Sequence, residues 1–321
     1  MIQAFLQAFG GTLVAILDIF LVVLAAGFLM RRKVITQTVI DGLSAATVVV
    51  FLPCLIFSSV VKSLDPAHQP LWWIIPLSAI IMAGAGLGLG WLLFRRELPE
   101  KQNMLPLACM QNSGYMVLPI GLKLFPEQFD TFALYTFLFV LGMNPVLWSV
   151  GKRLITHGES VRFIWKQWVT PPVVASLLAI AIALSGTVRF LPATVLGAVQ
   201  LMGNAAVPAA TFVLGAVLGS IAFQIRPYWA DALRVIGIKL FALPMLTILA
   251  LHLLGLAQGP SLLGKFILIE AAVAPATNLM IQVRHYGGDV PKIGSLMLLA
   301  YALNLFTLPL WLGLWDILVL P

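Results

Sequence analysis

The stretch Met104-Leu-Pro-Leu-Ala-Cys-Met-Gln-Asn-Ser-Gly-Tyr-Met-Val-Leu-Pro-Ile-Gly-Leu-Lys-Leu-Phe125 decides how this sequence is interpreted. Most of it is apolar, as a membrane-spanning helix is, but the polar run Gln111-Asn-Ser-Gly114 interrupts its middle and Pro119 follows. Inside lipid, each backbone N–H or C=O group without a partner costs several kcal/mol. The stretch therefore predicts a membrane helix that breaks where protein or water surrounds the break.

A second stretch in the other half of the chain has the same character. It reads Ile267-Leu-Ile-Glu-Ala-Ala-Val-Ala-Pro-Ala-Thr-Asn-Leu-Met-Ile-Gln-Val-Arg-His285 and carries Glu270, Pro275, Thr277 and Asn278 at a comparable depth. Interrupted helices at corresponding places in two halves of a membrane protein indicate a binding site for a transported solute.

The composition excludes a soluble protein. Hydrophobic residues make up 61% of the 321 residues and charged residues only 10%, whereas about a quarter of a soluble domain is charged. The net charge of +7 is compatible with a nucleic-acid partner, but the basic residues lie in short connections between apolar runs, where they orient a membrane protein in the lipid bilayer. We therefore expect no nucleic-acid partner.

The two cysteines and four histidines indicate no cofactor. Cys54 and Cys109 lie within apolar segments, and the histidines lack the spacing of metal ligands. The sequence also lacks a nucleophile next to a base and a phosphate-binding P-loop. We therefore predict no catalytic residues, no metal, no cofactor and no enzymatic activity.

The hydropathy pattern predicts an all-α integral membrane protein. We place ten membrane spans over residues 12–30, 39–61, 72–94, 104–125, 129–150, 168–186, 193–219, 230–254, 263–284 and 293–319. Most of the 19 Lys and Arg residues fall in the odd-numbered connections, which places those connections in the cytoplasm. The prediction is a multi-pass protein of the cell (inner) membrane with both termini extracytoplasmic.

Ten spans divide into two repeats of five, residues 1–150 and 168–321, joined by a cytoplasmic linker at 151–167. Because five is odd, the second repeat enters the membrane in the opposite direction. Prolines support the repeat weakly: Pro53 corresponds to Pro208, and Pro145 corresponds to Pro309. The two interrupted segments are the fourth span of each half.

On these segments the sequence resembles the auxin efflux carrier family, whose bacterial members are often described as malonate or malate permeases. The matching segments are Leu52-Pro-Cys-Leu-Ile-Phe, Asn112-Ser-Gly-Tyr-Met-Val-Leu-Pro119, Asn204-Ala-Ala-Val-Pro208, Ile238-Lys-Leu-Phe-Ala-Leu-Pro244 and Glu270-Ala-Ala-Val-Ala-Pro275-Ala-Thr-Asn278.

The resemblance implies inverted five-helix repeats in which broken helices 4 and 9 cross near the midplane, as in bile-acid/sodium symporters. It also implies a scaffold of helices 1, 2, 6 and 7, a moving transport core of helices 3–5 and 8–10, and a possible homodimer through the scaffold. Plant members have Pro-Asn where this chain has Gln111-Asn112, and some have a long cytoplasmic loop that is absent here. Both departures argue against auxin as the substrate.

The candidate substrate-binding residues lie at the two interruptions. A half-helix that begins near Tyr115 presents free N–H groups and the positive end of its dipole, which suits a carboxylate. The alternative is a pair of kinked helices whose polar groups bond only to each other. For Asn204, which precedes Pro208, a further alternative is that its side chain bonds to backbone groups that have lost their helical partners. The predicted residues are Asn112, Ser113, Gly114, Tyr115, Pro275, Thr277, Asn278 and, from the seventh span, Asn204.

Glu270 and Lys239 are the candidates for coupling. A carboxylate within the bilayer is a functional hypothesis by default, and Glu270 could hold a proton or a cation such as Na⁺. The alternative is a structural salt bridge between Glu270 and Lys239, and both roles are compatible.

Together these features predict a secondary active transporter for a small organic anion, a mono- or dicarboxylate, that works by an elevator-type alternating-access mechanism. The alternatives are an anion channel of the same architecture, a ligand-binding membrane sensor, and a membrane enzyme.

Overall fold

The computed structural model describes residues 2–65, 71–98, 100–155, 169–256, 261–286 and 288–319. Every regular element in these ranges is helical, which confirms the all-α prediction. Seven helical segments in the described ranges are long and apolar enough to cross a membrane. They cover Phe5–Arg31, Gln37–Ser63, Ile74–Phe94, Pro126–Ile155, Ala193–Gly219, Arg226–Leu253 and Val290–Leu318.

Three of the predicted spans are shorter or divided in the structure. The sixth is the 14-residue helix α9 (Pro171–Leu184). The fourth and ninth are both interrupted, as their polar residues predicted. Most of the predicted linker, residues 156–167, lies outside the described residues, and α8 (Lys152–Ile155) occupies its beginning.

Several of the long spans consist of α-helices joined by a π-helical turn. The elements are α1 (Ile2–Arg31), α2 (Gln37–Ala46), η1 (Thr47–Phe51), α3 (Leu52–Ser63), α4 (Ile74–Phe94), α7 (Phe129–Val146), η5 (Leu147–Gly151), α10 (Ala193–Asn204), α11 (Ala206–Gly219), α12 (Trp229–Ile236), η9 (Gly237–Ala242), α13 (Leu243–Leu253) and α16 (Val290–Val319).

Proline accounts for two of these π-helical turns. The turn η1 precedes Pro53, and η9 precedes Pro244. Proline has no N–H to donate, and its ring clashes with the carbonyl of the preceding turn in a regular helix. A wider turn relieves that clash without ending the helix.

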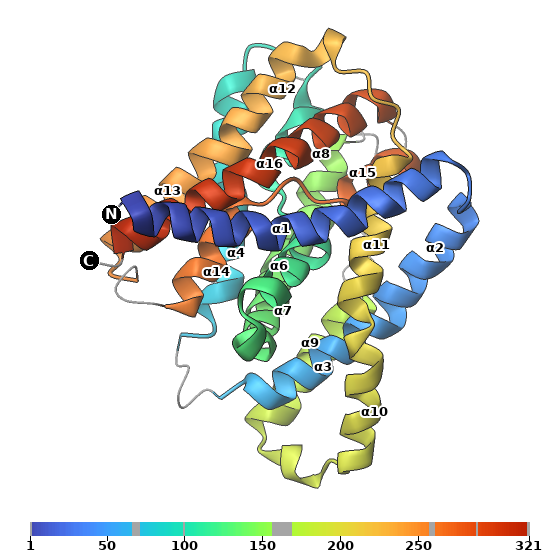
Figure 1. Ribbon diagram of the computed structural model, residues 1–321, viewed down its shortest axis with the longest axis vertical. Helices are drawn as coiled ribbons and strands as arrows, with labels where there is room; N and C mark the ends of the chain where they lie inside the picture. Colours follow the sequence, from blue (N-terminus) through green and yellow to red (C-terminus); the bar gives the residue numbers. More distant parts are fainter. Residues whose placement is uncertain are drawn as a thin grey trace.

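Helix α1, in the first half of the chain, packs mainly on helices of the second half. It packs against α11 and α16, and Figure 1 shows it running across the middle of the molecule. The beginning of α1 and the end of α16 lie close together in this view. Helices α3, α9 and α10 form a second group, and α4 packs against α7.

Charged residues in the connection after α4 pair with each other and with charged residues of α12. Glu97 accepts hydrogen bonds from Lys101 and Arg234, and Lys101 Nζ also lies 2.7 Å from an oxygen of Asp231. The bond from Lys101, followed by the one from Arg234, holds the pKa of the Glu97 carboxyl below its usual range. This cluster joins segments of the predicted third and eighth spans.

The packing of α1 on α11 depends on a close backbone approach at Gly215. A Cβ atom on Gly215 would lie 2.3 Å from the carbonyl oxygen of Val23. We expect Gly215→Ala to destabilise the protein by about 1–3 kcal/mol, as overpacking does, and thermal unfolding of the purified protein in detergent measures this loss. Gly197→Ala in α10 is the control, because no atom lies within 4 Å of the added methyl group; equal melting temperatures for the two variants would contradict the prediction.

Candidate functional site

The two interrupted segments meet at their breaks. The fourth predicted span consists of α5 (Leu105–Cys109), η3 (Ser113–Val117) and α6 (Leu118–Leu124), and the ninth consists of α14 (Leu262–Ala272) and α15 (Asn278–Tyr286). Gln111 and Pro275 form an isolated antiparallel bridge. In this bridge the N–H of Ala276 donates to the carbonyl of Met110 over 3.1 Å, so each break provides a backbone partner for the other.

Side chains of α16 form hydrogen bonds with backbone groups of the second break at Ala272, Ala274 and Pro275. The Asn304 amide donates to the carbonyl of Ala272 over 2.6 Å and accepts from the N–H of Ala274 over 3.3 Å. The Tyr301 hydroxyl donates to the carbonyl of Pro275 over 3.0 Å. These bonds satisfy backbone groups that would otherwise be costly inside a membrane.

Asn112 joins the two breaks through its side chain. Its Nδ2 donates to Thr277 Oγ1 over 3.0 Å and to the hydroxyl of Tyr301, which also lies 3.2 Å from Thr277 Oγ1. All three side chains are buried. These bonds agree in part with the alternative considered from the sequence, in which the polar groups of two kinked helices bond to each other.

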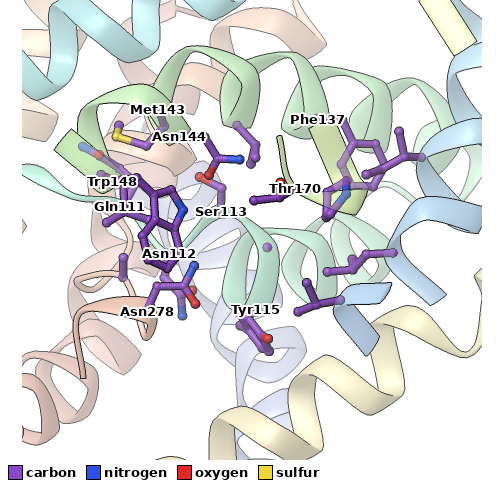
Figure 2. A pocket seen from close by; sticks show the side chains of 18 of the residues that line it. Gln111, Asn112, Ser113, Tyr115, Phe137, Met143, Asn144, Trp148, Thr170 and Asn278 are labelled. Atoms are coloured by element: carbon purple, nitrogen blue, oxygen red, sulfur yellow. The ribbon is translucent and has the colours of Figure 1, made fainter. Parts of the chain in front are cut away.

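A cavity of about 250 Å³ lies next to the crossing (Figure 2). Of the predicted site residues, those that line it are Asn112, Ser113, Gly114, Tyr115 and Asn278. Pro275 and Thr277 are buried at the crossing and do not line the cavity, although Ala276 between them does. The structure therefore brings most of the predicted residues to one place.

Asn204 lies elsewhere. It ends α10, is exposed, and accepts a hydrogen bond from Gln200 over 3.2 Å. It is not among the cavity's lining residues. The proline that follows it resembles those at the breaks, but α11 begins at Ala206 with only a short irregularity between the two helices.

Other lining residues were not among the predicted substrate-binding residues. Gln111, Asn144, Trp148 and Thr170 all line the cavity. Gln111 carries a detectable signal, since it belongs to the polar run of the break. Thr170 has no such signal, because only the packing of α9 against α3 brings it to the cavity.

The half-helix that follows the first break begins at the cavity. Asn112 is its N-cap residue, yet its side chain makes no capping hydrogen bond, because it is directed to Thr277 and Tyr301. The first N–H groups of a helix have no partner within the helix. A methyl group added at Gly114 would meet no atom within 4 Å, so this positively polarised end borders open space.

Glu270 contacts the same half-helix but does not line the cavity. It is fully buried on α14, and its Oε2 accepts a hydrogen bond from Ser113 Oγ over 2.7 Å. Lys239 on η9 is also fully buried, but in the described part of the chain neither its Nζ nor Glu270 Oε1 has a hydrogen-bond partner. The two side chains therefore do not form the hydrogen-bonded salt bridge considered from the sequence.

The Tyr301 hydroxyl bonds to both breaks, so its removal tests the crossing. We expect Tyr301→Phe to lower the free energy of unfolding by about 1–3 kcal/mol, because buried partners are left unpaired. A thermal or denaturant melt of the purified protein measures this. Tyr135→Phe is the control, since Tyr135 packs on Phe266 without a hydrogen bond to its hydroxyl among the described residues; a Tyr301 variant as stable as this control would contradict the role given to the hydroxyl.

Comparisons with known proteins agree with this geometry. The sequence profile of the membrane transport protein family matches residues 12–162 and 152–312. An uncharacterized transporter of Methanothermobacter thermautotrophicus is 25% identical over 94% of this chain and 98% of its own length. Protein PIN-LIKES 3 of Arabidopsis thaliana is 28% identical over 51% of this chain and 44% of its own length. Protein PIN-LIKES 1 of the same plant is 24% identical over the same share of this chain and 36% of its own length.

The family profile covers both broken segments and the residues that line the cavity. With its seven long apolar helices, the chain is a multi-pass membrane protein and a transporter rather than an enzyme. It belongs to the membrane transport protein family, the family of the auxin efflux carriers.

Proposed function

We propose that this protein is a secondary active transporter for a small organic anion, a mono- or dicarboxylate, which binds where the two broken segments cross. The observation that supports this most strongly is the uncapped half-helix beginning at Ser113, whose first turn borders the cavity. Free N–H groups and a positive helix end are a ready site for a carboxylate. The second half-helix, α15, contributes Asn278 to the same cavity.

We further propose an elevator mechanism on a ten-helix inverted repeat. Predicted scaffold helices 2 and 6 contribute Ser44, Val48 and Thr170 to the cavity, whereas predicted core helices 4, 5 and 9 contribute the break residues, Asn144 and Asn278. A site between these two groups changes its exposure when the core moves relative to the scaffold. A homodimer through the scaffold helices would hold the scaffold still.

The position of the cavity supports an inward-facing arrangement. Ser44, Trp148 and Thr170 belong to the span ends that the distribution of basic residues assigns to the cytoplasm. On the opposite side, ion pairs join the proposed scaffold to the proposed core: Lys62 with Asp130 over 3.6 Å, and Lys123 with Asp18 over 2.8 Å. In this proposal the protein lies in the inner membrane with both termini outside.

Glu270 is proposed to carry the coupling ion, a proton or Na⁺. Its hydrogen bond to Ser113 connects it to a residue that lines the cavity, so its charge state can affect substrate binding directly. Lys239, buried nearby without a hydrogen-bond partner, is the proposed counter-charge.

Substituting the break asparagines tests the anion site. We expect Asn112→Ala and Asn278→Ala to weaken binding of the transported carboxylate about tenfold. Asn112 holds the start of the half-helix in place through its bonds to Thr277 and Tyr301, and Asn278 lines the cavity. A thermal-shift screen of small carboxylates identifies a binding anion, and uptake into proteoliposomes then measures transport. Asn204→Ala is the control, since Asn204 lies outside the cavity; normal uptake by both break variants would overturn the site.

Counterflow separates a carrier from the two rival functions. A carrier accelerates labelled uptake when unlabelled substrate is present on the opposite side, because its site returns loaded. An anion channel gives no such acceleration, and a sensor gives binding without flux. We expect acceleration in proteoliposomes that contain the wild-type protein.

Neutralising Glu270 tests the coupling. We expect Glu270→Gln to make uptake independent of the proton or Na⁺ gradient, while exchange of labelled for unlabelled anion continues. Glu270→Asp, which keeps the charge, is the control and should retain part of the gradient dependence. Undiminished gradient-driven accumulation by Glu270→Gln would assign coupling to another residue.

A further inference from the structure

Gln111 lies at the most constrained point of the crossing. Its backbone is bridged to Pro275, and in this bridge the N–H of Ala276 donates to the carbonyl of Met110, the residue before Gln111. A backbone held in this way fixes the point from which the Gln111 side chain starts, so the positions that its amide can reach by rotation at the cavity are limited. Such positioning is what a selective binding site needs.

The amide of Gln111 has no hydrogen-bond partner among the residues that the structure describes. Gln111 is 3% exposed, and neither its Oε1 nor its Nε2 makes a hydrogen bond. Leaving a buried polar group unpaired is unfavourable. The neighbouring Asn112 differs, since its amide bonds to Thr277 and Tyr301. Gln111 is thus the side chain of the break whose hydrogen-bonding capacity remains unused.

We propose that Gln111 is a specificity-determining residue, which bonds to a hydroxyl group next to the carboxylate of the substrate; this rests on the proposed function. An amide offers one group that donates and one that accepts. A hydroxyl can accept from Nε2 and donate to Oε1, whereas a second carboxylate would only accept. The preferred ligand class is therefore a small hydroxycarboxylate.

The contact requires a rotation of the Gln111 side chain, because its polar atoms are covered in this structure. That rotation exchanges an unpaired amide for a paired one, so binding of the hydroxyl is favoured. A ligand without the hydroxyl leaves the amide unpaired. Sites built to bond a hydroxyl discriminate strongly against analogues that lack it.

Lactate and propionate are the probes, because they carry the same charge and differ by one hydroxyl group. We expect the wild-type protein to bind lactate about tenfold or more tightly than propionate, measured by calorimetry on the purified protein. Gln111→Leu should bind both with equal affinity, at the level of propionate to the wild type. If Gln111→Leu does not fold, Gln111→Met also removes the amide.

Gln282→Leu is the matched control. Gln282 is also fully buried, but it lies outside the cavity lining and donates to the carbonyl of Leu147 over 3.3 Å. It should keep the wild-type preference for lactate. A wild-type protein without this preference, or a preference that survives in Gln111→Leu, would refute the proposal for Gln111.

The same measurements separate this proposal from the proposed function. If other carboxylates bind and Asn112→Ala weakens them, the anion site stands and only the role of Gln111 falls. If no carboxylate binds, or if binding ignores Asn112, both fall.

Discussion

The bridge between the two broken segments is the interaction on which the structure depends. Neither break can persist alone inside a membrane, because its free backbone groups would face lipid. The N–H of Ala276 and the carbonyl of Met110 satisfy each other, and Tyr301 and Asn304 from α16 satisfy carbonyl and N–H groups around Pro275. Protein groups thus pair with the irregular backbone on one side, and its other side borders the cavity.

The polar groups around the two breaks fall into two sets. One set holds the crossing together, with Asn112, Thr277 and Tyr301 bonded to one another. The other set borders the cavity and keeps capacity for a ligand: the first turn at Ser113 and the unpaired amide of Gln111. Because Asn112 is bonded away from the helix start, it leaves that start uncapped. The structural role of one residue therefore creates the proposed binding role of its neighbours.

Glu270 lies outside both sets but contacts the second set through Ser113. Its bond to Ser113 fixes the half-helix, and its second oxygen remains without a partner within the described structure, as does the Nζ of Lys239. A change of charge at such a buried group alters the positions available to the residue it holds. This gives a physical route by which a coupling ion could control occupation of the proposed anion site without touching the anion.

The sequence by itself determined the membrane class, the all-helical fold and the location of both breaks, because hydropathy and helix-breaking polar runs are local properties of the chain. It also predicted Asn112 and Ser113 beside the cavity. Only the tertiary structure decided which polar side chains form hydrogen bonds at the crossing. Thr277 is bonded to Asn112 and Tyr301, whereas the Gln111 amide has no hydrogen-bond partner among the described residues. It also excluded Asn204 from the cavity lining and added Thr170. The reason is that these hydrogen-bond partners lie 24 and 165 residues apart along the chain, so only packing selects them.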